Sequence, residues 1–407
     1  MSKEALNIWF IHHYALPPYV PGVTRHFRLA KELQKQGHNV IIIAAHQHHK
    51  NTLVSLGKDE KNALEDIDNV RFLWIKGFSI SSGLVMRILS MFVFAFKILC
   101  KTGFSKIAQK PDLIIGCTPD PFTAFAAHRV SKAYNVPYVL HVGDLWPLSL
   151  IDLGKKPKWH PFIVLIGWLE KYLYWRAEKI ITPLPSPHAY IDKIAKQAGK
   201  VECIPIGIDH SMCPDAPPVP DRKDVFKVYY AGSHGRANGL RAILASAFLL
   251  KEHQNIEFHF IGDGEYKAEL MALCQKKGLT NVTFHDPVKQ SDLYQRLFDA
   301  DAFIINYEDC ETYRIGGISA NKIFDYMLCG RPIILGAPTN EDPVTAAGAG
   351  IKVHSNDKAA IKEAILKLYN TPVSERQAMA DKARAYVVKH HDYGVVGERL
   401  NSALSKL

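Results

Sequence analysis

Short apolar runs alternate with amphipathic segments along the first half of the chain. The apolar runs are brief and rich in β-branched residues, so they predict strands at residues 6–11, 40–45, 70–75, 113–116, 138–141 and 180–182. The amphipathic segments predict helices at residues 23–36, 121–134 and 162–178. Strands that alternate with helices are typical of a parallel sheet covered by helices on both faces.

The alternation stops near residue 204 and then resumes. Residues 204–225 are rich in Pro and Asp and have no periodicity, which predicts an interdomain linker. Strands are predicted again at residues 226–231, 257–261, 282–284, 302–306 and 332–335, with helices between and after them. We therefore predict two Rossmann-like, doubly wound α/β domains, residues 1–203 and 226–388, and a C-terminal helix, residues 389–407, that packs back on the first domain. The cleft between two such domains is the expected ligand site.

A formal net charge of +10 over 407 residues indicates an anionic partner. Nucleic acid, an acidic membrane surface and phosphorylated substrates all fit this charge. Lys and Arg are spread along the chain and do not cluster with aromatic residues, which argues against nucleic-acid binding.

The seven cysteines and 19 histidines show no spacing typical of a zinc site. We therefore expect no metal and no cofactor, and free thiols in a reducing cytoplasm. The first residues, MSKEALNIWFIHHY, carry an apolar stretch that is too early and too short for a signal peptide.

Two loops after predicted strands of the first half contain candidate binding residues. The loop at residues 12–27 carries Gly22 at a helix entrance, where backbone amides bind anions or sugar oxygens. A proline-stiffened turn explains this loop equally well. The loop at residues 141–149 carries Asp144, either as a sugar-binding or catalytic carboxylate or as a cap of the next turn.

Two loops of the second half have a residue composition typical of phosphate-binding sites. YYAGSHGRANGL (229–240) combines three glycines with Arg236, a residue suited to bidentate phosphate recognition. GGISANKIFDYMLCGRPII (316–334) places Lys322 and Asp325 where a helix begins, which suits a phosphate and a hydroxyl pair. The alternative for Lys322 and Asp325 is a solvated i,i+3 ion pair.

The run GLVMRILSMFVFAFKILC (83–100) is apolar nearly all round but shorter than the about 20 residues that cross a bilayer. It predicts either a buried helix or a helix that dips into a membrane face.

The loops, in this order and spacing, resemble those of retaining GT-B glycosyltransferases of the family-4 type, which act in bacterial surface-polysaccharide and O-antigen assembly. The resemblance rests on PPYVPGVTRHFRLAKEL (17–33), DLWP (144–147), IPIGID (204–209), GSHGRANGL (232–240), IGDGE (261–265) and SANKIFDYMLCGRPII (319–334). It implies a GT-B fold whose two domains face each other across a cleft. A nucleotide-sugar would bind mainly to the second domain and the acceptor mainly to the first.

The resemblance also implies roles for individual residues. Asp325 matches the second acid of an E-x7-E motif, which accepts hydrogen bonds from the ribose hydroxyls. Amides near the helix start would hold the diphosphate, and residues 286–288 match the loop that edges the base. The expected catalytic residues are Asp144, Arg236 and Lys322. The expected nucleotide-sugar-binding residues are Gly22, Gly232, Ser233, Arg236, Asn238, Asp286, Val288, Ser319, Ala320, Asn321, Lys322 and Asp325.

This chain departs from the family pattern at several positions. Gly317 stands where the first acid of E-x7-E is expected, and Gly143 replaces a frequent His. Ser233 and Asn238 occupy the positions of the family's usual Arg and Lys, so Arg236 between them is expected to supply that charge. These departures leave the donor sugar open.

The resemblance implies metal-independent, front-face transfer, in which the leaving phosphate takes the acceptor's proton. A UDP-sugar is the expected donor because UDP is frequent in the family, and a polyprenyl-diphosphate-linked saccharide is the expected acceptor. The enzyme would be cytoplasmic and peripheral on the inner face of the cytoplasmic membrane, docked through residues 83–100. A nucleotide-sugar epimerase of the same fold and a non-catalytic partner of another transferase are the alternatives.

Overall fold

The computed structural model describes residues 5–407 apart from 21, 23, 49–50, 53–55, 57–59, 78–83, 214–215 and 223. The chain divides into two compact units, one made of Met1–Pro205 with Tyr393–Leu407 and the other of Ile206–Asp392. Most of the predicted linker therefore belongs to the second unit, where Ile208 and Cys213 are buried in the core.

The first unit is built on an eight-stranded sheet in the order β10-β9-β8-β7-β1-β2-β6-β5. Its strands are β1 (Asn7–Ile11), β2 (Asn39–Ala45), β5 (Asn62–Ile67), β6 (Val70–Ile75), β7 (Leu113–Cys117), β8 (Tyr138–His141), β9 (Lys179–Thr182) and β10 (Val201–Cys203). A separate small hairpin pairs β3 (Gln47–His48) with β4 (Asn51–Thr52).

One strand corrects the prediction of a fully parallel sheet. β5 runs antiparallel to β6 at the sheet edge, whereas the other seven strands are parallel. The reversal occurs at Asp68 and Asn69, whose φ angles of 49° and 69° are those of a tight two-residue hairpin turn. β5 was missed because its exposed face gives a weak apolar pattern, NALEDI.

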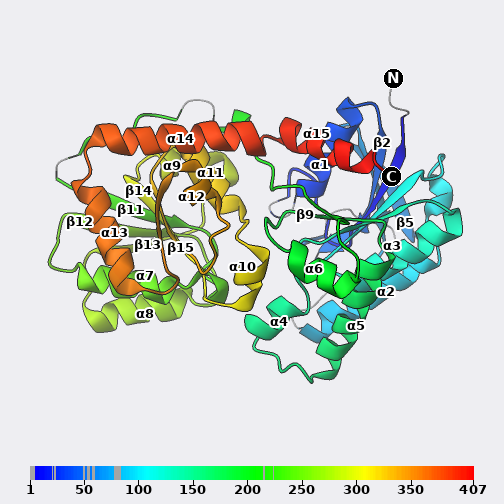
Figure 1. The fold of residues 1–407 in the computed structure, drawn as a ribbon, viewed down its shortest axis with the longest axis horizontal. Coiled ribbons are helices and arrows are strands. Elements are labelled where there is room, and N and C mark those ends of the chain that lie inside the picture. The colour runs from blue at the N-terminus through cyan, green and yellow to red at the C-terminus, as the bar shows by residue number, and fades with distance from the viewer. Residues whose placement is uncertain are drawn as a thin grey trace. The chain divides into compact units, whose positions relative to one another are not determined.

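Helices cover both faces of the first sheet (Figure 1). On one face lie α1 (Arg25–Lys35) and α15 (Tyr393–Leu404), which pack against each other and against alternate residues of the strands, such as Phe10 and Ile42. The other helical segments are α2 (Leu84–Leu99), η1 (Phe104–Lys106), α3 (Pro121–Tyr134), α4 (Leu148–Asp152), α5 (Pro161–Arg176) and α6 (His188–Ala195). Among them, α2 and α5 both pack on α3.

The second unit is a six-stranded, fully parallel sheet in the order β13-β12-β11-β14-β15-β16. Its strands are β11 (Phe226–Ala231), β12 (Ile256–Ile261), β13 (Val282–His285), β14 (Ala302–Asn306), β15 (Ile333–Gly336) and β16 (Gly350–Val353). Its helical segments are η2 (His210–Met212), η3 (Arg236–Asn238), α7 (Leu240–Leu249), α8 (Lys267–Lys277), α9 (Gln290–Leu297), α10 (Glu311–Gly316), α11 (Asn321–Cys329), α12 (Pro343–Ala347), α13 (Lys358–Asn370) and α14 (Val373–His391).

Alternation along β11 shows how helices cover both faces of this sheet as well. Val228 and Tyr230 are buried in a core shared with α7, α8 and α13, whereas Tyr229 is buried in a core shared with α11 and α14. The predicted pair of doubly wound α/β units is confirmed.

Among the described residues, we find no helix whose length and apolar character would let it cross a membrane. The segment predicted at residues 83–100 forms α2 from Leu84, and Gly83 lies outside the described residues.

The last helix is an integral part of the first unit's core, and this can be tested. Leu400 on α15 is fully buried, so Leu400→Ala should destabilise the first unit by about 2–5 kcal/mol through lost burial and a cavity. The measurement is urea unfolding followed by tryptophan fluorescence. Leu407→Ala, at a residue that is 45% exposed, is the control and should change little. Equal stability of the two variants would contradict the packing role of α15.

Candidate functional site

A cavity of about 550 Å³ opens at the carboxyl edge of the second unit's sheet. Loops after β11, β12 and β13 form one side of it, and helices α9 and α11 form the other. Ligands of open α/β sheets bind at this edge. The cavity is lined by Ala231, Gly232, Ser233, Ile261, Gly262, Asp263, Pro287, Val288, Leu293, Leu297, Ala320, Asn321, Lys322, Asp325 and Tyr326.

Two turns that contain glycine, Gly232 after β11 and Gly262 after β12, line the cavity. A Cβ on Gly262 would lie 2.1 Å from the carbonyl oxygen of Gly232, so no other residue fits there without displacing the neighbouring loop. Both glycines have φ angles in the region that favours glycine, 134° and 150°. The amide of His234 donates to the carbonyl oxygen of Asp263 at 2.8 Å, which ties the loop after β11 to the loop after β12.

The N-terminus of α11 faces the cavity. Ala320 precedes the helix in an extended conformation, and no side chain caps the helix start. Helix N-termini carry amides without intrahelical partners and a partial positive charge, which together attract anions. Ala320, Asn321 and Lys322 all line the cavity, so the helix start supplies an anion-binding end.

Lys322 is held by polar neighbours other than carboxylates. Its Nζ donates to the hydroxyl of Tyr230 at 3.1 Å and to the side-chain oxygen of Asn238, and lies 4.9 Å from the centre of the Tyr230 ring. Among the described residues no carboxylate lies within ion-pair distance of it. Burial lowers the pKa of Lys322 to about 7, so the amine is only partly protonated near neutral pH, and its charged form has no carboxylate partner among the described residues.

Asp325 lies one turn further along the same face of α11. Its carboxylate accepts a hydrogen bond from the hydroxyl of Tyr294 at 2.8 Å. Burial raises the pKa of Asp325 to about 6, and the hydrogen bond from Tyr294 opposes that rise. Lys322 and Asp325 are therefore not the solvated ion pair that their spacing alone allowed.

Three other predicted residues border this arrangement. Ser233 lines the cavity, and Asn238 orients Lys322 while its own amide donates to the carbonyl oxygen of Ser233 at 2.9 Å. Arg236 is exposed, and its Nε donates to the hydroxyl of Tyr266 at 3.0 Å, so it does not line the cavity.

Of the remaining predicted residues, Val288 lines the cavity, whereas Asp286, Ser319, Gly22 and Asp144 lie outside its lining. Asp286 is exposed and pairs with Lys267 at 3.2 Å, whereas Val288, two residues later, lines the cavity. Ser319 is half-buried just before α11. Gly22 and Asp144 belong to the first unit.

Asp144 follows the end of β8 and is largely enclosed. Its carboxylate accepts a hydrogen bond from the hydroxyl of Ser149 at 3.0 Å, and burial raises its pKa. At the entrance of α1, Gly22 has a φ angle of 142°, which favours glycine, and a Cβ there would lie 2.6 Å from a methyl carbon of Leu16.

Sequence reasoning missed the aromatic residues that fix the two charged groups. Tyr230 holds Lys322 together with the predicted Asn238, and Tyr294 holds Asp325. The two tyrosines lie in a strand and in a helix, with no spacing that links them to the residues they hold. Leu293 and Leu297, from the same helix as Tyr294, complete an apolar wall with Val288. The cavity can thus bind an anion at the helix start, a pair of hydroxyls at Asp325 and a flat ring against the apolar wall.

Solved structures match nearly the whole chain and define its fold. A sucrose-phosphate synthase from Thermosynechococcus elongatus matches with a TM-score of 0.76 and 15% identity over 98% of both chains. An α,α-trehalose-phosphate synthase (UDP-forming) from Burkholderia vietnamiensis matches with a TM-score of 0.70 and 12% identity over 99% of both chains. The Anabaena protein HepE, in complex with UDP and glucose, matches with a TM-score of 0.69 and 14% identity over 99% of this chain and 100% of that one. The protein therefore has the GT-B fold, as predicted.

Two family models match separate parts of the chain. The model for Glycosyltransferase Family 4 matches residues 21–212, and the model for Glycosyl transferases group 1 matches residues 226–371. The chain belongs to the family-4 (group 1) glycosyltransferases, and it moves a sugar from a nucleotide-sugar. In sequence, no curated protein matches it.

The lowered pKa of Lys322 predicts a pH-dependent stability. The unfolded chain keeps this proton up to about pH 10.5, whereas the folded chain loses it above about pH 7. Between these values the unfolded state binds more protons, so the wild-type free energy of unfolding gains a contribution that rises with pH. Lys322→Met removes the buried ammonium, so it should be more stable than wild type at pH 7, by a margin that shrinks toward pH 10.

Urea unfolding of both proteins across this pH window measures that margin. Lys276→Met, at an exposed lysine of α8, is the control, and its difference from wild type should not depend on pH. A constant margin for Lys322→Met would show that its ammonium is well solvated.

Proposed function

We propose that this protein transfers a sugar with retention from a UDP-sugar to a saccharide carried on a polyprenyl diphosphate, in surface-polysaccharide assembly. The main support for the proposed nucleotide-sugar site is that Lys322, Asp325 and the start of α11 line one cavity. An uncompensated ammonium, a carboxylate and a helix N-terminus match the phosphates and ribose of a nucleoside diphosphate.

In the proposed complex the diphosphate lies at the start of α11, held by amides of residues 319–321 and by Lys322. The ribose hydroxyls donate to Asp325, and the base packs against the apolar wall that contains Val288 and Leu293. UDP is preferred because two proteins of the same fold carry it in their names, HepE in complex with UDP and glucose and the UDP-forming trehalose-phosphate synthase.

Transfer then depends on stabilising the leaving diphosphate, since the proposed front-face reaction uses no protein nucleophile and no metal. Charge grows on the leaving phosphate in the transition state, and Lys322 and the amides at the start of α11 are proposed to stabilise it. Loss of one such donor costs on the order of 3 kcal/mol of barrier. Arg236 is the second proposed cation of this reaction, from the loop that also carries Ser233 and Asn238.

The acceptor half of the proposal rests on strand-end residues of the first unit. Asp144, which is largely enclosed after β8, is proposed to contact a sugar hydroxyl of the acceptor. The backbone of the Gly22 turn, at the entrance of α1, is proposed to lie beside the acceptor as well. Gly317 lies buried at the end of α10 and offers no carboxylate to the donor sugar, so the identity of that sugar is left open.

The donor proposal is tested by thermal shift with UDP, GDP, dTDP and their sugars. We expect UDP compounds to raise the unfolding temperature of wild type most. Asp325→Ala should weaken UDP binding by about tenfold to a hundredfold, because charge-assisted hydrogen bonds contribute roughly 1.5–3 kcal/mol. Asp381→Ala, at an exposed acid of α14, is the control.

The outcomes separate the alternatives. Equal shifts with UDP and GDP would remove the preference for UDP, and an unchanged affinity in Asp325→Ala would remove its role. UDP binding without sugar transfer to a lipid-diphosphate acceptor would favour a non-catalytic partner, and interconversion of the UDP-sugar would favour an epimerase.

A membrane surface is proposed to present the acceptor, and two helices of the first unit support this. On α2 the exposed residues Val85, Leu89, Phe92, Phe96 and Leu99 follow one helical stripe. On α5 the exposed residues Val164, Leu165, Trp168 and Trp175 do the same. Soluble helices normally turn such residues inward, whereas Trp-rich apolar stripes suit a membrane interface.

The charges around these stripes complement an anionic bilayer. Residues 69–111 contain no Asp or Glu, while Arg87 and Lys101 are exposed along α2 and just beyond it. On α5, Lys171 and Arg176 are exposed, and its single acid, Glu170, is buried. Both helices pack on α3, with Phe92 against Phe122 at 4.0 Å between ring centres.

Co-sedimentation with anionic phospholipid vesicles tests the docking. The double variant Phe92→Glu, Phe96→Glu should lose most vesicle binding, because two charges would enter the apolar interface. Phe94 is unsuitable because it is buried against His13. The control is Leu249→Glu, Met271→Glu, two exposed apolar residues of the second unit. Binding of wild type and the Phe double variant to the same extent would refute docking through α2.

A further inference from the structure

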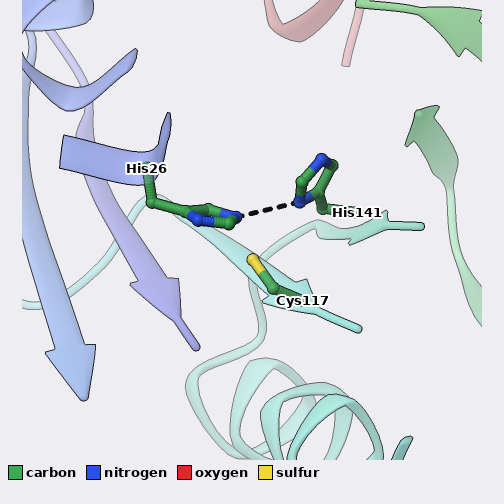
Figure 2. A group of neighbouring side chains, drawn as sticks. All are labelled: His26, Cys117 and His141. Atoms are coloured by element: carbon green, nitrogen blue, oxygen red, sulfur yellow. Dashed lines mark hydrogen bonds between the residues drawn. The ribbon is translucent and has the colours of Figure 1, made fainter. Parts of the chain in front are cut away.

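Three metal-binding side chains from distant parts of the sequence converge in the first unit (Figure 2). Cys117 and His141 end the adjacent parallel strands β7 and β8 and are paired in register, so their side chains lie on the same face of the sheet. His26, in the first turn of α1, lies over that face. The sequence shows no metal motif here because such motifs are recognised by ligands a few residues apart, whereas these three residues are far apart in the sequence.

The three donor groups are buried and close together. The exposed fractions of His26, Cys117 and His141 are 2%, 1% and 3%. Their donor atoms all lie within 4.8 Å of one another, and Nε2 of His26 lies 3.0 Å from Nδ1 of His141. Metal bonds of roughly 2.0–2.3 Å require the most distant pair to approach by about 1 Å, which small side-chain rotations supply.

The cluster is not a satisfied hydrogen-bond network. Nδ1 of His26 and Nε2 of His141 have no partner among the described residues. Within the described part of the chain, the only hydrogen-bond contact of the Cys117 thiol is with the carbonyl oxygen of Ile115 in its own strand, at 3.9 Å. Buried polar groups are normally paired, so three under-satisfied groups in one place need an explanation.

The protonation states suit a metal. Burial lowers the pKa of both His26 and His141 well below the usual range, so their imidazoles are neutral and each keeps a lone pair. Burial raises the pKa of the Cys117 thiol, so a metal ion would have to displace its proton to solvent. The ring of His12 packs against the ring of His26, at 4.1 Å between ring centres and a tilt of 32°, which restrains the orientation of that imidazole.

The neighbouring charge decides which ion fits. Arg25 is held by hydrogen bonds of 2.7 Å to the carbonyl oxygens of Ile204 and Pro205, and it contributes to the lowered pKa of both histidines. A divalent ion with one thiolate would leave two net positive charges in this buried region, counting Arg25. A monovalent ion is neutralised by the thiolate and adds no net charge, which avoids the cost of burying a further charge.

We propose that His26, Cys117 and His141 form a buried three-coordinate site for a soft monovalent metal ion, Cu(I), that fastens α1 to β7 and β8. Thiolate and imidazole are the donors that select Cu(I). Binding forms two metal–nitrogen bonds and one metal–sulfur bond and breaks the hydrogen bond between the histidines. The imidazole that donates in this hydrogen bond shifts its proton to its other ring nitrogen, and the thiol proton is released to solvent, with no change of oxidation state. The site lies in the first unit and is independent of the proposed donor cavity.

Anaerobic titration of the full chain with Cu(I), against a chromophoric Cu(I) chelator, tests the site. Wild type should retain one equivalent more Cu(I) than Cys117→Ser, and His141→Gln should bind at least tenfold more weakly than wild type. Cys100→Ser, which removes an exposed cysteine outside the cluster, should behave as wild type. Circular dichroism verifies the fold of each variant. Because Cys117→Ser and His141→Gln remove different ligands, a folding defect in one variant still leaves the other as a test.

The coordination chemistry gives a second readout. The X-ray absorption spectrum of the loaded protein should show both nitrogen and sulfur ligands. Sulfur ligands alone would assign the copper to other cysteines and overturn the proposal. Equal retention by wild type and Cys117→Ser, or retention of Zn²⁺ in preference to Cu(I), would also overturn it.

Discussion

The cavity of the second unit depends on one close approach between two backbones. The turn after β11 and the turn after β12 touch at Gly232 and Gly262, where a single added Cβ would meet a carbonyl oxygen. Both glycines and the start of α11 line the same cavity. The loop after β11 then runs through Ser233 to Asn238, which holds Lys322. The position of the loop that holds Lys322 therefore depends on the absence of a side chain at Gly262, next to Gly232.

The architecture was predictable because it depends on patterns that are local in sequence. Buried parallel strands give short apolar runs, and their alternation with helices required two doubly wound sheets. The hairpin of β5 and β6 was missed although its turn residues, Asp68 and Asn69, are typical of a tight reversal. The apolar pattern of β5 is weak because that strand lies at the edge of the sheet with a partly exposed face.

The charged residues of the cavity were predictable for a different reason. Lys322 and Asp325 lie three residues apart on one helix, so their spacing in the sequence predicts that they are close together. Tyr230 and Tyr294 were missed because each contacts its partner from another element, at separations of 92 and 31 residues in the sequence. The cluster of His26, Cys117 and His141 escaped notice for the same reason, since strand pairing and helix packing bring the three together. Contacts that depend on tertiary structure leave no periodicity in the sequence.

The half-protonated state of Lys322 near neutral pH has a consequence for the energetics of donor recognition. A diphosphate placed beside the amine would favour its charged form, so that binding near neutrality takes up a fraction of a proton from the buffer. The heat of binding would then include the ionisation enthalpy of whichever buffer gives up that proton. Calorimetric enthalpies measured in two buffers of different ionisation heat would differ, while the dissociation constant at a fixed pH would stay the same.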